Sequence, residues 1–157
     1  MALKVTFVLL LTAFVLCKSY GKQCEKAKPF AYLSLVLQWA PGVCYRNDKC
    51  HEFDEKWTIH GNWPENSAKE FPEFCCNKNF NASVLKPILN DIKSNWVSLV
   101  TDDHSFWKHE WDRHGKCATY SPQLRGQLNY FNQTLQLFHR LNINSVFEGT
   151  SITAGPS

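Results

Sequence analysis

The cysteines of this chain and the apolar run that precedes most of them constrain its fold more than any other feature. Seven cysteines are present, and Cys17 closes an apolar run that follows a single lysine. The run is too short to span a bilayer and is followed by small residues up to Gly21, as in a secretory signal peptide. We therefore expect residues 1–21 to be a signal peptide and residues 22–157 to form one exported domain.

Cysteines in a small exported domain indicate disulfide bonds, but six of them allow fifteen pairings. A structural zinc site is the alternative, yet no C-x-x-C pair is present. Sequons for N-glycosylation at Asn81 and Asn132 also fit the secretory pathway. We expect an extracellular protein, or one in the lumen of a lysosome or another endomembrane compartment, without a membrane anchor. The cysteines are Cys24, Cys44, Cys50, Cys75, Cys76 and Cys117.

The net charge does not indicate extended binding of nucleic acid. It is +3 for the whole chain, and two of the lysines lie in the predicted signal peptide, so the exported part is close to neutral. Any attraction for phosphate must therefore come from a few local side chains. Internal repeats and long linkers are absent from the sequence, so we expect a single domain and a monomer.

The hydrophobic pattern predicts two strands. Residues 30–39 are apolar, aromatic and branched, which favours a buried central strand. Residues 57–60 form a second, shorter strand, which would end at His60 before the turn residues Gly61 and Asn62.

Apolar residues at helical spacing predict three helices. The first covers residues 83–96, with Pro87 near its start, and the second covers residues 105–114, closed by Gly115 in a left-handed conformation. The third begins at Ser121, which precedes a proline. Strands and helices are mixed, which predicts an α+β fold. The third helix carries an apolar side formed by Leu128, Phe131, Leu135, Phe138 and Leu141.

The segment KHEWDRHGKC carries the residues best suited to chemistry. Glu110 and His114 are four positions apart and Arg113 lies between them, so a carboxylate, a guanidinium and an imidazole share one helical face. Trp107 and Trp111 would face the opposite way, into a core.

The same segment superficially resembles the zinc motif H-E-x-x-H, but its spacing is H-E-x-x-x-H. His109 and His114 would lie about 140° apart around a helix of ~3.6 residues per turn, so both cannot ligate one metal. We expect neither a metal nor any other cofactor.

Cleavage of RNA by internal attack needs a base for the 2′-hydroxyl, an acid for the leaving 5′-oxygen and cations for the phosphorane. Two imidazoles and a guanidinium meet these needs. The reference pKa of histidine, ~6.5, lets one copy be charged and another neutral in mildly acidic surroundings. His60, Glu110, Arg113 and His114 are therefore the candidate catalytic group.

The segments WTIHGNWP and FWKHEWDRHGKC resemble the two active-site segments of the ribonuclease T2 family, in the family's order. The similarity extends from LVLQWAPGVC to LNINSVF. It implies a central antiparallel sheet with packed helices. It also implies an endoribonuclease that cleaves single-stranded RNA through a 2′,3′-cyclic phosphate, with weak base preference and without a metal. DNA, which lacks the attacking 2′-hydroxyl, would not be a substrate.

The resemblance also implies a role for each residue. His60 matches the acid that protonates the leaving oxygen, and His114 matches the general base. Glu110 and Arg113 match the groups that orient and stabilise the pentacoordinate phosphate, and His109 matches a phosphate-binding histidine.

Trp63 matches an aromatic residue that stacks on a base, and Gln38 also faces a base site by this resemblance. The alternative for Trp63 is a core position held by Pro64. The resemblance further implies three disulfides, although adjacent Cys75 and Cys76 could exchange partners: Cys44–Cys50, Cys76–Cys117 and Cys24–Cys75.

Three departures from the family pattern matter, and two of them, Arg113 and the end of the sequence at Ser157, favour a different function, a secreted non-catalytic binding or toxin-like protein, whereas the intact histidines and Glu110 favour the enzyme. Arg113 stands where the family usually has lysine, and Asn62 stands where it usually has leucine. The sequence also stops at Ser157, before the family's C-terminal portion, either as a fragment or as a short form.

Overall fold

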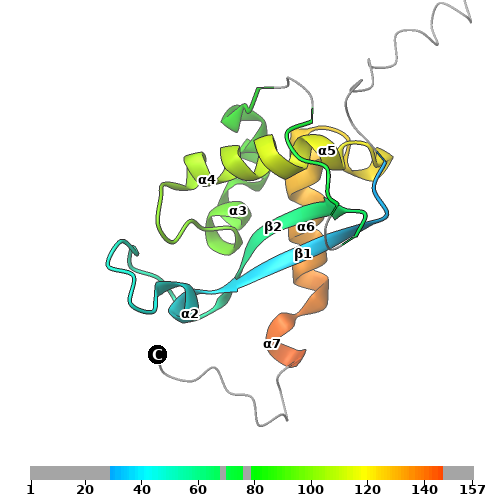
Figure 1. The fold of residues 1–157 in the computed structure, drawn as a ribbon. Helices are drawn as coiled ribbons and strands as arrows, with labels where there is room; N and C mark the ends of the chain where they lie inside the picture. Colours follow the sequence, from blue (N-terminus) through cyan, green and yellow to red (C-terminus); the bar gives the residue numbers. More distant parts are fainter. Residues whose placement is uncertain (1–28, 68–69, 76–78, 147–157) are drawn as a thin grey trace, which may run out of the picture.

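The computed structural model describes residues 29–67, 70–75 and 79–146. The predicted signal peptide, Cys24 and Cys76 lie outside these residues. Antiparallel strands pack against helices, which is the expected α+β arrangement (Figure 1). The elements are β1 (Tyr32–Trp39), α2 (Ala40–Cys44), β2 (Trp57–Glu65), η1 (Ala82–Ile88), α3 (Leu89–Asn95), α4 (Asp103–Glu110), η2 (Trp111–Gly115), α5 (Lys116–Ala118), η3 (Pro122–Leu124), α6 (Gln127–Leu141) and α7 (Ile143–Val146).

In the described part of the chain the sheet consists of β1 and β2. Their antiparallel register places Tyr32 opposite Glu65 and Trp39 opposite Trp57. The prediction of a strand in residues 30–39 is therefore confirmed, but most of its side chains are half-buried rather than buried. The physical reason is that β1 has one described neighbour, so one of its edges is not covered by a described strand.

The prediction that the second strand ends at His60 is wrong. Gly61 pairs with Val36 and Asn62 pairs with Leu35, so both predicted turn residues lie inside β2. Pairing with β1 satisfies the backbone of this segment, and that outweighs the local turn preference of glycine and asparagine. Asn62 is buried, and its side-chain amide donates a hydrogen bond to Thr134 Oγ1 at 3.0 Å, so its side chain contacts α6 and does not stabilise a turn.

The first predicted helix is present but divided. Residues 82–88 form the 3-10 helix η1, which contains Pro87, and α3 follows directly. Proline lacks a backbone N–H and crowds the preceding turn, so it belongs to the tighter segment and not to the α-helix. No helix in the described part of the chain is long and apolar enough to cross a membrane.

The second predicted helix is longer than expected, and Gly115 does not end it. Asp102 caps α4 by accepting from the Ser105 N–H at 2.9 Å, and the helix continues through the π-helical turn η2 into α5. Gly115 has right-handed helical angles, with φ −58°. Its missing Cβ serves packing instead, because a Cβ would lie 2.5 Å from the Trp111 ring and 2.9 Å from the Tyr130 ring.

The long third helix begins later than predicted. Ser121 starts only the short turn η3, and α6 begins after Gly126, whose φ of 95° glycine adopts freely. Its apolar side contacts η1, α3 and β2, and it crosses the strands in Figure 1. Phe131 and Leu135 are buried as predicted, whereas Leu141 is exposed.

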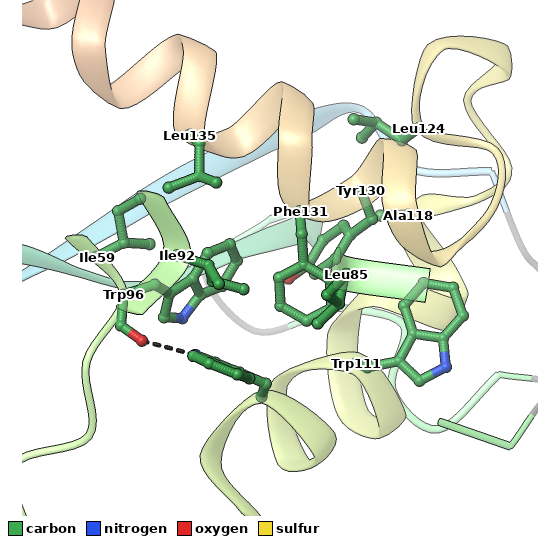
Figure 2. Packing of buried hydrophobic residues seen from close by; sticks show 11 residues of the cluster. Ile59, Leu85, Ile92, Trp96, Trp111, Ala118, Leu124, Tyr130, Phe131 and Leu135 are labelled. Carbon is green, nitrogen blue, oxygen red and sulfur yellow. Dashed lines mark hydrogen bonds between the residues drawn. The ribbon is translucent and has the colours of Figure 1, made fainter. Parts of the chain in front are cut away.

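Helices and β2 share one hydrophobic cluster, part of which Figure 2 shows. Trp107 and Trp111 belong to it, as the helical spacing predicted. Buried ring donors connect this core to the backbone beside the candidate site. Trp96 Nε1 donates to the His60 carbonyl at 2.9 Å, and the Tyr130 hydroxyl donates to the Asn62 carbonyl at 3.1 Å.

Two disulfides lie within the described residues. Cys44 and Cys50 are bonded, as the resemblance implied. The second joins Cys75 to Cys117, so the expected bonds Cys76–Cys117 and Cys24–Cys75 are wrong. The Phe74 N–H donates to the Arg113 carbonyl at 2.9 Å, which brings the next residue, Cys75, beside the helix that carries Cys117.

Candidate active site

The candidate catalytic residues come from two elements held against one core. His60 lies in β2, Glu110 is the last residue of α4, and His114 lies one turn later in η2. π-helical turns often occur at functional sites. Gly61 permits the close approach of strand and helix, because a Cβ there would lie 2.2 Å from both Glu110 Oε2 and Trp63 Nε1.

Glu110 lies at the centre of the site. Its Oε1 is 3.7 Å from His60 Nε2, and its Oε2 accepts a hydrogen bond from Trp63 Nε1 at 3.0 Å. The residue is 1% exposed, and no described group donates a hydrogen bond to Oε1. Burial raises the pKa of Glu110 to about 7, although the Trp63 bond and the charge of Arg113 act in the opposite direction.

His114 is held neutral by its surroundings. It is 4% exposed, and its ring stacks on Trp63 with centroids 4.8 Å apart and planes 20° apart. Burial lowers the pKa of His114 to about 3, and the nearby charges of Arg113, His109 and His60 add to that effect. A neutral imidazole can accept a proton.

His60 is the more accessible imidazole, with 40% of its side chain exposed. Its ring meets Trp63 and Phe106 edge-on, with centroids 5.5 Å and 5.4 Å away. The pKa of His60 is also lowered, first by burial and then by the charges of His109 and Arg113. An anion bound beside His60 would oppose these effects and favour its charged form.

The two cationic candidates line different cavities. His109 is exposed and lines a cavity of about 460 Å³ together with His60, Phe106 and Gln38. Arg113 lines a second cavity, of about 200 Å³, together with His114. His109 and Arg113, which are four positions apart in the sequence, thus contribute to different cavities.

The two base-binding candidates also divide between the cavities. Trp63 lines the cavity of Arg113 and His114, and Gln38 lines that of His60. The Gln38 amide is fixed, because its Nε2 donates to Thr58 Oγ1 and to the Val97 carbonyl, both at 3.1 Å. Trp63 is half-buried and bonded to Glu110, so it is part of the site rather than of the hydrophobic core.

Several residues of the site were not predicted. Phe106 lies four positions before Glu110, so helical spacing within the quoted segment could have identified it. Glu73, Glu65 and Phe71 line the cavity of Trp63, and Glu73 forms an ion pair with Arg113 Nε. These three lie far from the catalytic helix in sequence, and no spacing rule relates them to it.

Within the described residues, no group of three or more histidine, cysteine, aspartate and glutamate side chains could hold a metal ion. The site combines two imidazoles, a buried carboxylate and an indole, with Arg113 and His109 in the linings of the two cavities. Such a set can transfer protons between two positions and stabilise negative charge between them.

Comparisons with known proteins agree with this geometry. Residues 30–157 match the model of the Ribonuclease T2 family. Ribonuclease T2 of Sus scrofa is 36% identical over 127 residues, covering 76% of this chain and 60% of the relative. Ribonuclease T2 of Homo sapiens is 34% identical over 120 residues, covering 73% of this chain and 44% of the relative. Extracellular ribonuclease LE of Solanum lycopersicum is 30% identical over 135 residues, covering 80% of this chain and 58% of the relative.

Solved structures show the same fold. The crystal structure of human RNase T2 superposes with a TM-score of 0.65 at 34% identity, covering 74% of this chain and 59% of that one. RNase NT in complex with 5′-AMP superposes with a TM-score of 0.72 at 26% identity, covering 83% and 66%. The chain thus spans about half to two-thirds of the length of these relatives. On the extent of the family match and the shared fold, this chain belongs to the ribonuclease T2 family.

Proposed function

We propose that the protein is an endoribonuclease that cleaves single-stranded RNA by transesterification through a 2′,3′-cyclic phosphate, with weak base preference and without a metal. The observation that carries this proposal is the contact of one indole, Trp63, with His60, His114 and buried Glu110, whose Oε1 also lies 3.7 Å from His60 Nε2.

His114 acts as the general base. Its lowered pKa keeps it neutral at mildly acidic pH, so it can take the proton from the 2′-hydroxyl. The oxygen then attacks the adjacent phosphorus and the bond to the leaving 5′-oxygen breaks. His60 gives its proton to that oxygen, and the phosphate anion bound beside it favours the charged form that can do so.

Glu110 and the two cations act on the phosphate between the histidines. In its ionised form Glu110, whose Oε1 lies 3.7 Å from His60 Nε2, would stabilise the charged form of that ring. In its protonated form, favoured by the raised pKa, Glu110 can also donate a hydrogen bond to a phosphate oxygen. Arg113 and His109 supply positive charge from the two flanking cavities.

The two cavities suit the bases on either side of the cleaved bond. Trp63 and Phe71 offer aromatic surface in one, and Phe106 does so beside Gln38 in the other. Stacking on aromatic rings tolerates any base, which agrees with a weak base preference. RNase NT, solved in complex with 5′-AMP, supports nucleotide binding by this fold.

A secreted location and a signal peptide in residues 1–21 are part of the proposal. Two disulfides and the similarity to an extracellular ribonuclease support an oxidising compartment. Within it we expect a monomer whose partner is single-stranded RNA, with glycans at Asn81 and Asn132.

The test is an RNA cleavage assay at mildly acidic pH in the presence of a chelator. The wild-type protein should release products that end in a cyclic phosphate, and DNA of the same sequence should stay intact. His60→Ala and His114→Ala should each nearly abolish turnover while RNA still binds. Near wild-type cleavage by both variants would contradict the site assignment.

The second candidate is a non-catalytic binding or toxin-like protein. The ion pair between Arg113 and Glu73 favours it, because a paired cation is less available to a phosphate. Binding of RNA without cleavage by the folded wild-type protein would establish this alternative. Arg113→Lys, which restores the usual family residue, should remain active if the enzyme proposal holds.

A further inference from the structure

A short segment, residues 71–75, is attached to the helical turn that carries Arg113 and His114. The Glu73 carboxylate accepts a hydrogen bond from Arg113 Nε, and the Phe74 N–H donates to the Arg113 carbonyl at 2.9 Å. The next residue, Cys75, is bonded to Cys117 of the same helix. An ion pair, a backbone hydrogen bond and a disulfide therefore fix this segment against a single turn.

The backbone of the segment is itself constrained. Phe74 has a φ of 51°, in the left-handed region that a bulky residue rarely adopts. Such a conformation is unfavourable and persists where surrounding contacts impose it. The orientation of Glu73, one residue earlier, is thus set by two strong attachments and not by a free loop.

Arg113 lines the same cavity as His114 and Trp63. The Glu73 carboxylate accepts a hydrogen bond from Arg113 Nε. No described residue accepts a hydrogen bond from the two terminal amino groups of Arg113, so both can donate to a ligand. Those two groups form the planar fork that binds two oxygens of a phosphate. A bond at Nε fixes the plane of that fork.

We propose that Glu73 is a positioning residue, which holds the Arg113 guanidinium so that its terminal amino groups face a phosphate bound beside His114. The inference rests on the proposed function, since it concerns the same phosphate. Both side chains are partly exposed, and exposed ion pairs add little stability. The expected role of the pair is therefore orientation.

Charge and orientation predict opposite results for the removal of Glu73. A carboxylate near an anion site repels the anion, so charge alone predicts tighter phosphate binding without it. If Glu73 orients Arg113, its removal lets the guanidinium move and phosphate binding becomes weaker. The direction of the change therefore distinguishes the two roles.

The experiment measures the binding of inorganic phosphate by calorimetry in the full chain at mildly acidic pH. Glu73→Ala should weaken binding about tenfold, through the loss of a pre-oriented fork. Glu73→Gln keeps an acceptor for Nε and should stay within about twofold of the wild type. Glu65→Ala is the matched control, because Glu65 lines the same cavity but has no described bond to Arg113. This variant should bind phosphate as tightly as the wild type or more tightly.

A double-mutant cycle with Arg113→Met completes the test. In the Arg113→Met background, Glu73→Ala should not change the phosphate affinity further. The proposal is overturned if Glu73→Ala binds phosphate as tightly as the wild type or more tightly. It is also overturned if Glu73→Ala weakens phosphate binding by the same factor in the Arg113→Met background, or if the wild-type protein binds no phosphate. Circular dichroism confirms that each variant is folded. Phosphate binding does not require turnover, so an inactive wild-type chain would contradict the proposed function and still leave this measurement decisive.

Discussion

Glu110 has surroundings that favour chemistry over stability. It is buried, its Oε1 receives no hydrogen bond from a described group, and its pKa is raised to about 7. A carboxylate whose pKa is higher in the folded state than in the unfolded state binds its proton more tightly when folded. Stability therefore falls as the pH rises from about 4.5 to about 7 and stays lower above that range.

Glu110→Gln should remove this pH-dependent loss. The variant keeps an oxygen that can accept from Trp63 and cannot become charged. We expect it to be more stable than the wild type by about 1–3 kcal/mol at pH 8, with a smaller difference at pH 4.5, and to lose most of its activity. Urea unfolding at the two pH values measures the difference. A variant that is less stable at both values would show that the carboxylate contributes to the fold.

His109 influences His60 through its charge, after the larger effect of burial. In the proposed mechanism His60 must be protonated to act as the acid, so its lowered pKa should place the alkaline limb of the kcat/KM profile at lower pH than that of a free histidine. His109→Gln removes one of the charges that lower this pKa.

The alkaline limb of His109→Gln should therefore move to higher pH, although the maximum rate falls with the loss of a phosphate contact. The profile of kcat/KM against pH gives the result directly. His104→Gln is the control, because His104 lies in the same helix but contacts Phe80 instead of the site, and it should keep the wild-type profile. An unmoved limb in His109→Gln would contradict the electrostatic coupling.

At the scale of elements, the two described disulfides close loops of very different length. Cys44 and Cys50 are 6 positions apart, whereas Cys75 and Cys117 are 42 positions apart. A longer closed loop restricts the unfolded chain more, so its bond contributes more to stability in the chain-entropy model.

Replacement of Cys75 and Cys117 by serine should lower the free energy of unfolding by about 4 kcal/mol, and replacement of Cys44 and Cys50 by about 2 kcal/mol. Denaturant unfolding of the two double variants compares them. The first should also weaken phosphate binding, because it detaches the segment that carries Glu73. If removal of the Cys44–Cys50 bond lowers the free energy of unfolding more, native contacts and not loop entropy determine how much each disulfide contributes to stability.

At the scale of the whole molecule, the net charge gives little general attraction for RNA. The net charge is small, and one of the two proposed phosphate-binding cations is paired with Glu73. If the protein neutralises one or two phosphates of a single strand, a plot of the logarithm of its RNA-binding constant against the logarithm of the salt concentration should have a slope no steeper than about −2.

His114→Ala, which should leave RNA uncut, is suited to this measurement. Fluorescence anisotropy of a labelled single-stranded oligonucleotide across a range of salt concentrations should give the shallow slope. A slope near −4 or steeper would indicate a more extended basic surface than the described residues provide.

The sequence by itself determined the family, the mixed α+β class and the helix that carries the candidate catalytic residues. These follow from local information: the spacing of Glu110 and His114 along one helix, the apolar side of α6, and two segments that resemble known motifs. Helical periodicity and short motifs persist in any surroundings, which is why they can be recognised without a structure.

The tertiary structure decided the features that depend on residues distant in sequence. The pairing of β2 with β1 placed Gly61 and Asn62 inside a strand, and the path of residues 71–75 selected Cys75 as the partner of Cys117. The protonation states of Glu110 and His114 follow from burial, which no single segment encodes. Glu73 meets Arg113 across 40 positions of the chain, and only the folded chain brings these two charges together.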